Sequence, residues 1–98
     1  MRKYELMYII RPDLEEAQVE ALSEKVKSAI TDNGGKIQNH EIMGKRRLAY
    51  EIEKFRDGIY VLVNFSAPTE SIDALEHVIR INDEIIRHLI IHDVASGA

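Results

Sequence analysis

Strict alternation of side-chain character marks the start of the chain. From Tyr4 to Ile10 every even-numbered position is large and apolar, whereas the odd-numbered positions mix charged and apolar side chains. Successive side chains of a strand point to opposite faces of a sheet, so this period predicts a strand over residues 3–10 with one buried face. The other face is left with Lys3, Glu5, Met7 and Ile9.

Three further segments have strand character. Residues 36–53 predict one long strand that bends at Gly44, because an interior glycine is typical of a bulge, and the following Asp57-Gly58 is a turn signal. Residues 59–65 are rich in valine and aromatic side chains, as a central strand is, and residues 85–92 predict the last strand. The third strand has no such clear alternation; if Val61, Val63 and Phe65 face the core, then Tyr60, Leu62 and Asn64 face away from it.

Two segments have helical spacing instead. Over residues 13–33 apolar side chains recur every three or four positions, and Asn33-Gly34-Gly35 provides a helix end. Asp13 and Glu16 fit an N-cap and its reciprocal partner. A second helix is predicted to open at Pro68-Thr69 and to end at Asn82-Asp83.

The order of these elements is βαββαβ, which is the ferredoxin-like plan within the α+β class. Right-handed crossovers place both helices on one face of a four-stranded antiparallel sheet, in the spatial order four-one-three-two. We expect a single domain over residues 1–98, with a frayed tail at about 95–98. The sheet face without helices carries enough apolar side chains that we expect something to cover part of it.

Charge is unevenly distributed along the chain. The net charge is −4, and the two predicted helices, within 13–33 and 68–84, are the acidic segments. The densest charge run is nevertheless basic, in Gly44-Lys45-Arg46-Arg47-Leu48-Ala49-Tyr50. Three adjacent cations suit phosphate contact. The alternative is that the run is a solvent-exposed segment beside a hairpin, where its charges keep an edge strand from pairing with other chains.

Several functional classes find no support in the residues. The chain has no cysteine, no serine in a nucleophile-elbow setting, and no apolar run long enough to span a membrane. His88 and His92 lie about 13 Å apart on a strand, too far for one metal ion. We therefore expect a soluble cytoplasmic protein that has no catalytic residue, metal, cofactor or small-molecule substrate.

Two alternatives stay open on the same fold. An acylphosphatase-like hydrolase would use Arg11 in the loop after the first strand, although that loop has no glycines to expose backbone donors. A homodimeric ligand sensor would use the uncovered face of the sheet.

Four segments spread over nearly the whole chain are distinctive: Met1-Arg2-Lys3-Tyr4-Glu5, Pro12-Asp13-Leu14, the run from Gly44 to Tyr50, and Asn82-Asp83 to Arg87. In this order and spacing they resemble the bacterial small-subunit ribosomal protein six family. The basic-Leu-Ala-Tyr segment is the most specific. Glu51 departs from the pattern, because many members have proline there; either residue blunts an edge strand.

The resemblance implies a structural constituent of the small ribosomal subunit, located in the cytoplasmic ribosome and without enzymatic activity. It implies that the chain pairs with small-subunit ribosomal protein eighteen, and that the pair binds the central domain of small-subunit ribosomal RNA during assembly. As RNA-binding residues we predict Arg2, Lys3, Lys45, Arg46, Arg47 and Arg87. As protein-partner residues we predict Arg46, Leu48, Ala49, Tyr50, Glu51, Ile52, Tyr60 and Leu62.

Overall fold

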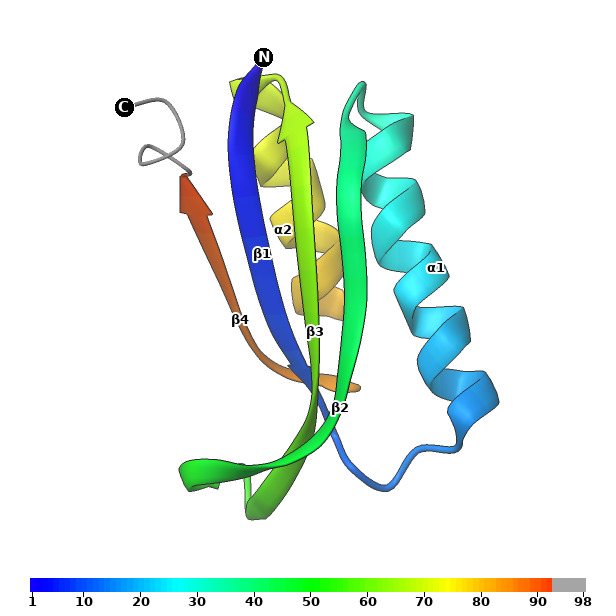
Figure 1. Cartoon of the computed structure of the whole chain (residues 1–98), viewed down its shortest axis with the longest axis vertical. Helices are drawn as coiled ribbons and strands as arrows, with labels where there is room; N and C mark the ends of the chain where they lie inside the picture. The colour runs from blue at the N-terminus through cyan, green and yellow to red at the C-terminus, as the bar shows by residue number, and fades with distance from the viewer. Residues whose placement is uncertain (93–98) are drawn as a thin grey trace.

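A computed structural model describes residues 1–92, and the expected tail at 95–98 lies outside them (Figure 1). The chain forms the predicted sequence of elements, with a short 3₁₀ turn added before the second helix. In chain order they are β1 (Arg2–Ile10), α1 (Glu16–Asp32), β2 (Lys36–Ile52), β3 (Phe55–Ala67), η1 (Thr69–Ser71), α2 (Ile72–Ile81) and β4 (Ile85–His92).

The strands form one antiparallel sheet in the order β2-β3-β1-β4. This is the predicted arrangement, and it leaves β2 and β4 as the two edges. In the view of Figure 1, α2 lies behind the sheet and α1 lies to the right of β2, so the face toward the reader carries no helix. The ferredoxin-like prediction is confirmed.

The core lies between the helices and one face of β1 and β3. Tyr4, Leu6, Tyr8 and Ile10 are all buried, as the alternation predicted, and Val61, Val63 and Phe65 join them from β3. The hydroxyl of Tyr8 donates a hydrogen bond to Ser23 of α1 over 3.5 Å. Burial raises the pKa of Tyr8 to about 12, so this side chain stays neutral inside the core.

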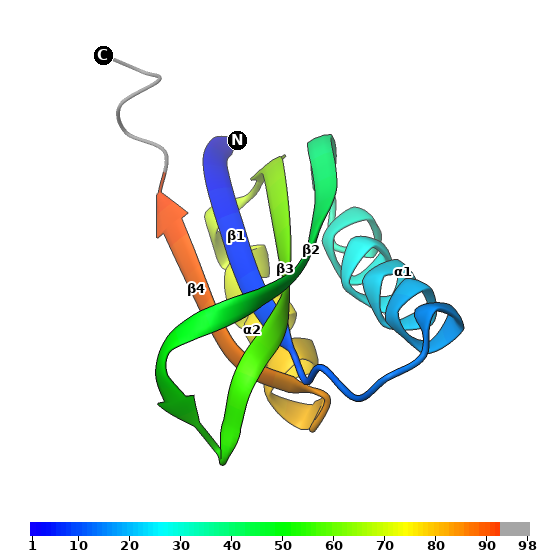
Figure 2. The ribbon, with the colours of Figure 1, turned by 60° about the horizontal axis from the view of Figure 1, so that its bottom comes forward.

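The strand β2 bends across the uncovered face of the sheet. Its pairing with β3 shifts between Ile42 and Gly44, where Gly44 adopts a φ of +92°, a conformation that glycine adopts at little cost. Beyond this bulge the strand curls toward β4 (Figure 2). Leu48 is thereby buried. Part of the cover that the apolar face needs therefore comes from the chain itself.

The turn between β2 and β3 is not at Asp57-Gly58, and that prediction is wrong. The chain reverses at Glu53 and Lys54, which both have positive φ, of 48° and 72°, as a tight two-residue hairpin turn requires. Gly58 lies within β3 instead. A Cβ there would collide with the side chain of Ile9, so the glycine permits a close approach of strands and does not make a turn.

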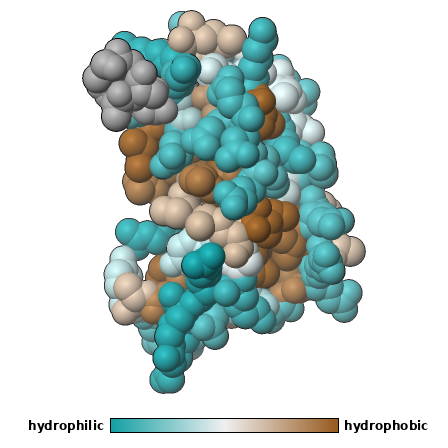
Figure 3. Space-filling model, in the orientation of Figure 1, coloured by the Kyte–Doolittle hydropathy of each residue, from teal (hydrophilic) through white to brown (hydrophobic). Residues whose placement is uncertain are grey.

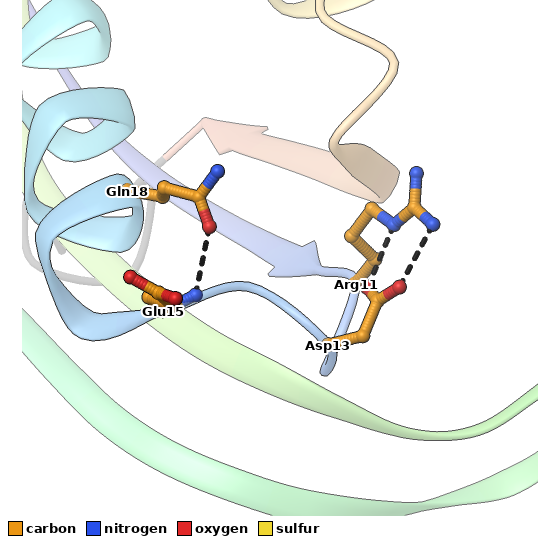
Figure 4. Close-up of polar contacts among 4 residues, drawn as sticks. All are labelled: Arg11, Asp13, Glu15 and Gln18. Carbon is orange, nitrogen blue, oxygen red and sulfur yellow. Dashed lines mark hydrogen bonds and ion pairs between the residues drawn. The ribbon is translucent and has the colours of Figure 1, made fainter.

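Both helix starts also differ from the predictions. Helix α1 begins at Glu16, and its capping box is formed by Glu15 and Gln18, with the Glu15 amide donating to Gln18 Oε1 over 2.9 Å (Figure 4). Asp13 is not the N-cap, because its carboxylate binds Arg11. At the second helix, Pro68 precedes the 3₁₀ turn η1, and α2 itself begins only at Ile72.

His40 lies under α1, near Glu24 and Lys27. It is opposite Val63 in the sheet, so it faces the helices, and its buried Nε2 contacts no donor or acceptor among residues 1–92. Burial lowers the pKa of His40 and the nearby Lys27 lowers it further, while Glu24 raises it. The folded protein therefore favours the neutral ring.

Gly58→Ala should destabilise the fold. The added methyl group meets Ile9 within a packed interior, and overpacking of this kind costs about 1–3 kcal/mol. Chemical denaturation would measure the loss. In a double-mutant cycle with Ile9→Ala, the two costs should be clearly less than additive. If the two losses of unfolding free energy simply add, the side chain of Ile9 is not the group for which Gly58 leaves room.

Acid should destabilise the protein partly through His40. A histidine whose pKa is lowered on folding contributes stability above its unfolded pKa of about 6.5, and this contribution is lost as the pH falls through the lower folded value. Denaturation between pH 7.5 and pH 5 should therefore show a smaller loss of stability in His40→Gln than in the unsubstituted protein. Parallel pH profiles would contradict this role, since the other titrating groups are common to both proteins.

Candidate protein and nucleic-acid interface

The sheet face opposite the helices carries the candidate site. Residues that are paired directly across strands share a face, so the register places Met7, Leu62 and Leu89 in one row of this uncovered face. Leu89 and Ile91 of β4 are large apolar side chains that are 50% and 45% exposed. Figure 3 looks onto this face and shows apolar side chains near mid-height, framed by hydrophilic ones.

A groove lies at the hairpin end of this face. It has a volume of about 240 Å³ and is enclosed by the curled end of β2 together with β1, β3 and β4. Its apolar lining includes Ile9, Leu48, Tyr60 and Leu89, with Arg87 and His88 at its side. It therefore combines an apolar surface with few polar groups, as binding grooves do.

A contact between Tyr50 and Arg87 ties the curled end of β2 to β4. The guanidinium of Arg87 donates a hydrogen bond to the Tyr50 hydroxyl over 2.6 Å, and it lies 5.7 Å from the centre of the tyrosine ring. These residues come from opposite edge strands. The hairpin is thus held over the groove by one hydrogen bond and one cation–π contact.

The register separates the cations of the run at residues 45–47. Lys45 lies opposite the buried Ile59 and faces the helix side, where it lines a hollow with Glu16 and Glu20. Arg46 lies opposite Gly58, on the uncovered face, and Arg47 lies opposite Asp57. All three side chains are exposed. The run is therefore not one continuous basic patch.

The other predicted RNA contacts lie at both ends of the sheet. Where β1 begins, Arg2 lies on the helix side and Lys3 lies on the uncovered face. Arg2 Nη1 is 3.2 Å from Nε2 of His92. Arg87 is opposite Ile9, near the far end of β1. Ile9 comes six positions after Lys3 on β1, so the two residues lie about 20 Å apart along the strand. The six predicted cations are therefore divided between two regions.

The predicted protein contacts gather around the groove. Leu48, Ala49, Tyr50, Ile52 and Tyr60 all line it, Leu48 as a buried side chain and Tyr50 as an exposed one. Leu62 lies on the same face, opposite Met7. Arg46 and Glu51 are exposed on β2, with Glu51 Oε1 3.9 Å from Arg56 Nε.

Sequence reasoning missed Leu89, His88 and Ile91 in this region. Residues 85–92 are apolar at almost every position that is not Arg87 or a histidine. Alternation therefore could not assign their faces. Pairing this strand with β1 would have placed Leu89 and Ile91 on the uncovered face, opposite Met7 and Glu5, and His88 opposite the buried Tyr8.

The loop after β1 does not offer a free cation for a hydrolase. Arg11 donates two hydrogen bonds to the carboxylate of Asp13, at 2.8 and 2.9 Å (Figure 4), and its guanidinium lies 5.3 Å from the ring centre of Phe55. The hydrogen bond and charge of Asp13 raise the pKa of Arg11, and the hydrogen bond from Arg11 lowers the pKa of Asp13. Within residues 1–92 no group of three His, Asp or Glu residues could hold a metal ion.

Comparison with known proteins identifies the family. Residues 3–92 match the family model described as ribosomal protein S6. The chain belongs to the ribosomal protein S6 family. The small ribosomal subunit protein bS6 of Halalkalibacterium halodurans is 52% identical over 93 residues, which cover 95% of this chain and 98% of that protein. The bS6 protein of Desulforamulus reducens is 50% identical with the same coverage of both chains.

A solved structure supports the S6 fold. The crystal structure of 30S ribosomal protein S6 from Thermotoga maritima matches with a TM-score of 0.95 at 38% sequence identity, over 98% of this chain and 91% of that one. S6 proteins are structural ribosomal proteins and not enzymes, so the hydrolase alternative is set aside. Membership makes this chain a protein of the small subunit of the cytoplasmic ribosome. No helix within residues 1–92 is long and apolar enough to cross a membrane.

Proposed function

We propose that this S6-family chain binds small-subunit ribosomal RNA together with small-subunit ribosomal protein eighteen, during assembly of the central domain. The observation that carries the proposal is the uncovered sheet face with its apolar groove beside the free edge of β2. A face of this kind is typical of a docking surface, because an exposed apolar patch bordered by polar groups favours association.

Protein eighteen is proposed to occupy the groove and the free edge of β2 from Arg46 to Ile52. The edge offers unpaired backbone groups to a neighbouring chain. The groove offers Tyr60 and Leu89 as apolar anchors, and aromatic anchors often carry much of the energy of an interface.

The RNA is proposed to contact the exposed cations Arg2, Lys3, Arg47 and Arg87, which would position it through phosphate and sugar groups. Arg87 already donates to Tyr50, but a guanidinium has five N–H donors and can bind a phosphate as well. The chain has a net charge of −4 and acidic helices behind the sheet. We therefore assign much of the electrostatic attraction for RNA to the partner protein.

RNA binding should depend on the partner. A filter-binding or fluorescence titration would use an RNA comprising the central domain of small-subunit ribosomal RNA, with and without protein eighteen, at several salt concentrations. The pair should bind more tightly than this chain alone, and with a steeper salt dependence, since it neutralises more phosphates. Binding by the isolated chain that is as tight as binding by the pair would contradict the proposal.

The groove can be tested separately with two exposed aliphatic residues. Leu89→Asp places a charge beside the groove and should weaken pairing with protein eighteen by roughly ten-fold or more, because the interface would bury an unpaired carboxylate. Ile81→Asp is the matched control, since Ile81 is 64% exposed and lines no part of this groove. Calorimetric titration would measure both. If the two variants pair equally well, the groove is not the interface.

A further inference from the structure

One row of side chains crosses three strands at the end of the sheet where β1 begins. Lys3 of β1 lies opposite Ser66 of β3, and Ser66 lies opposite Lys36 of β2. Directly opposed residues share a face, and Ser66 alternates with the buried Phe65 and Ala67. All three members of the row therefore lie on the uncovered face. The two lysines are exposed and the serine is half-buried.

The spacing of the row follows from the geometry of a sheet. Neighbouring strands lie about 4.8 Å apart, so the Cα atoms of Lys3 and Lys36 are roughly 10 Å apart, with the serine hydroxyl between them. Lysine side chains are long and flexible enough to converge on one anion or to bind two adjacent ones. The arrangement offers cationic donors on both sides of a neutral donor.

The neighbouring row on the same three strands is polar, and no carboxylate of residues 1–92 forms an ion pair with either lysine. Among the ion pairs within residues 1–92, none involves Lys3 or Lys36. The next row consists of Glu5, Asn64 and Asn39, paired in that order across the same three strands. Glu5 is the only acidic side chain of these two rows. Together they carry two lysines, two amides and one hydroxyl, all of which can donate hydrogen bonds.

We propose that the row of Lys3, Ser66 and Lys36 binds the sugar–phosphate backbone of RNA. The lysines contact phosphate oxygens, the Ser66 hydroxyl donates to a phosphate between them, and the adjacent amides can reach ribose hydroxyls. This inference rests on the proposed function and adds Lys36 and Ser66 to its RNA contacts. It gives the end of the uncovered face where β1 begins to RNA alone, while the groove end takes the protein partner, with Arg87 beside it as a further RNA contact.

Protection of a free edge does not account for the row. Lys36 lies on the edge strand β2, where a lysine commonly discourages aggregation. Lys3, however, lies at the start of β1, whose following residues pair with both β3 and β4. An interior strand has no free edge to guard. Two lysines without an ion-pair partner among residues 1–92, together with a hydroxyl in the same register row, are better explained by an anionic ligand.

The test measures RNA affinity of the pair with protein eighteen across a salt series. The variants are Lys3→Gln and Lys36→Gln, and the matched control is Lys25→Gln, which removes an exposed lysine from α1 on the opposite side of the molecule. Each row variant should reduce the slope of log affinity against log salt by about one, as expected for a lost phosphate contact. Lys25→Gln should leave the slope unchanged, and Lys36→Arg should retain it.

Three results would overturn the inference, and they are distinguishable. If Lys36→Gln and Lys25→Gln give the same salt slope, the row does not bind RNA. If Lys36→Gln weakens pairing with protein eighteen in the absence of RNA, the row contacts an acidic segment of that protein instead. If the unsubstituted pair shows no salt-dependent RNA binding, the proposed function itself fails, and the row fails with it. Circular dichroism would establish that each variant is folded.

Discussion

The one-sided burial of β1 and β3 determines much of the rest of this structure. Their core-facing side chains, among them Leu6, Tyr8, Val61 and Val63, are fully excluded from water by the two helices. Because side chains alternate across a strand, fixing one face against the helices also fixes which residues face away. Both candidate contact regions, the groove and the row of Lys3, Ser66 and Lys36, are consequences of that register. A slip of one residue would destroy the core and the binding face together.

The features that depend on local periodicity could be predicted from the sequence, and those that depend on packing between strands could not. Alternation from Tyr4 to Ile10 identified the buried face of β1, and Gly44 correctly marked a bend. Asp57-Gly58 was misleading because a glycine that admits a neighbouring side chain has the same local signature as a glycine in a turn. The real turn, at Glu53 and Lys54, has neither glycine nor proline and so gave no signal.

The same reasoning explains the candidate site. Composition and topology were enough to predict an uncovered face with apolar and basic residues. They could not show that Lys45 faces the acidic helix side while Arg46 faces the other way, or that Lys36 joins Lys3 across the sheet. Those relations connect residues that are distant in the chain. The uncovered face thus carries an apolar groove toward one end and two lysines at the other, so an acidic protein presents two unlike surfaces on one sheet.

The bulge beside Gly44 has a consequence for the rest of β2. Strand side chains repeat every two residues, and one inserted residue exchanges inside and outside for everything that follows. With the bulge, Leu48 is buried on the uncovered face near Gly58, and Arg46 shares its side of the strand. Without the bulge, Lys45 and Arg47 would instead lie on the uncovered face, and Arg46 and Leu48 would face the helices. A single backbone irregularity, with no change in composition or net charge, thus decides which of three adjacent cations lies on each face of the sheet.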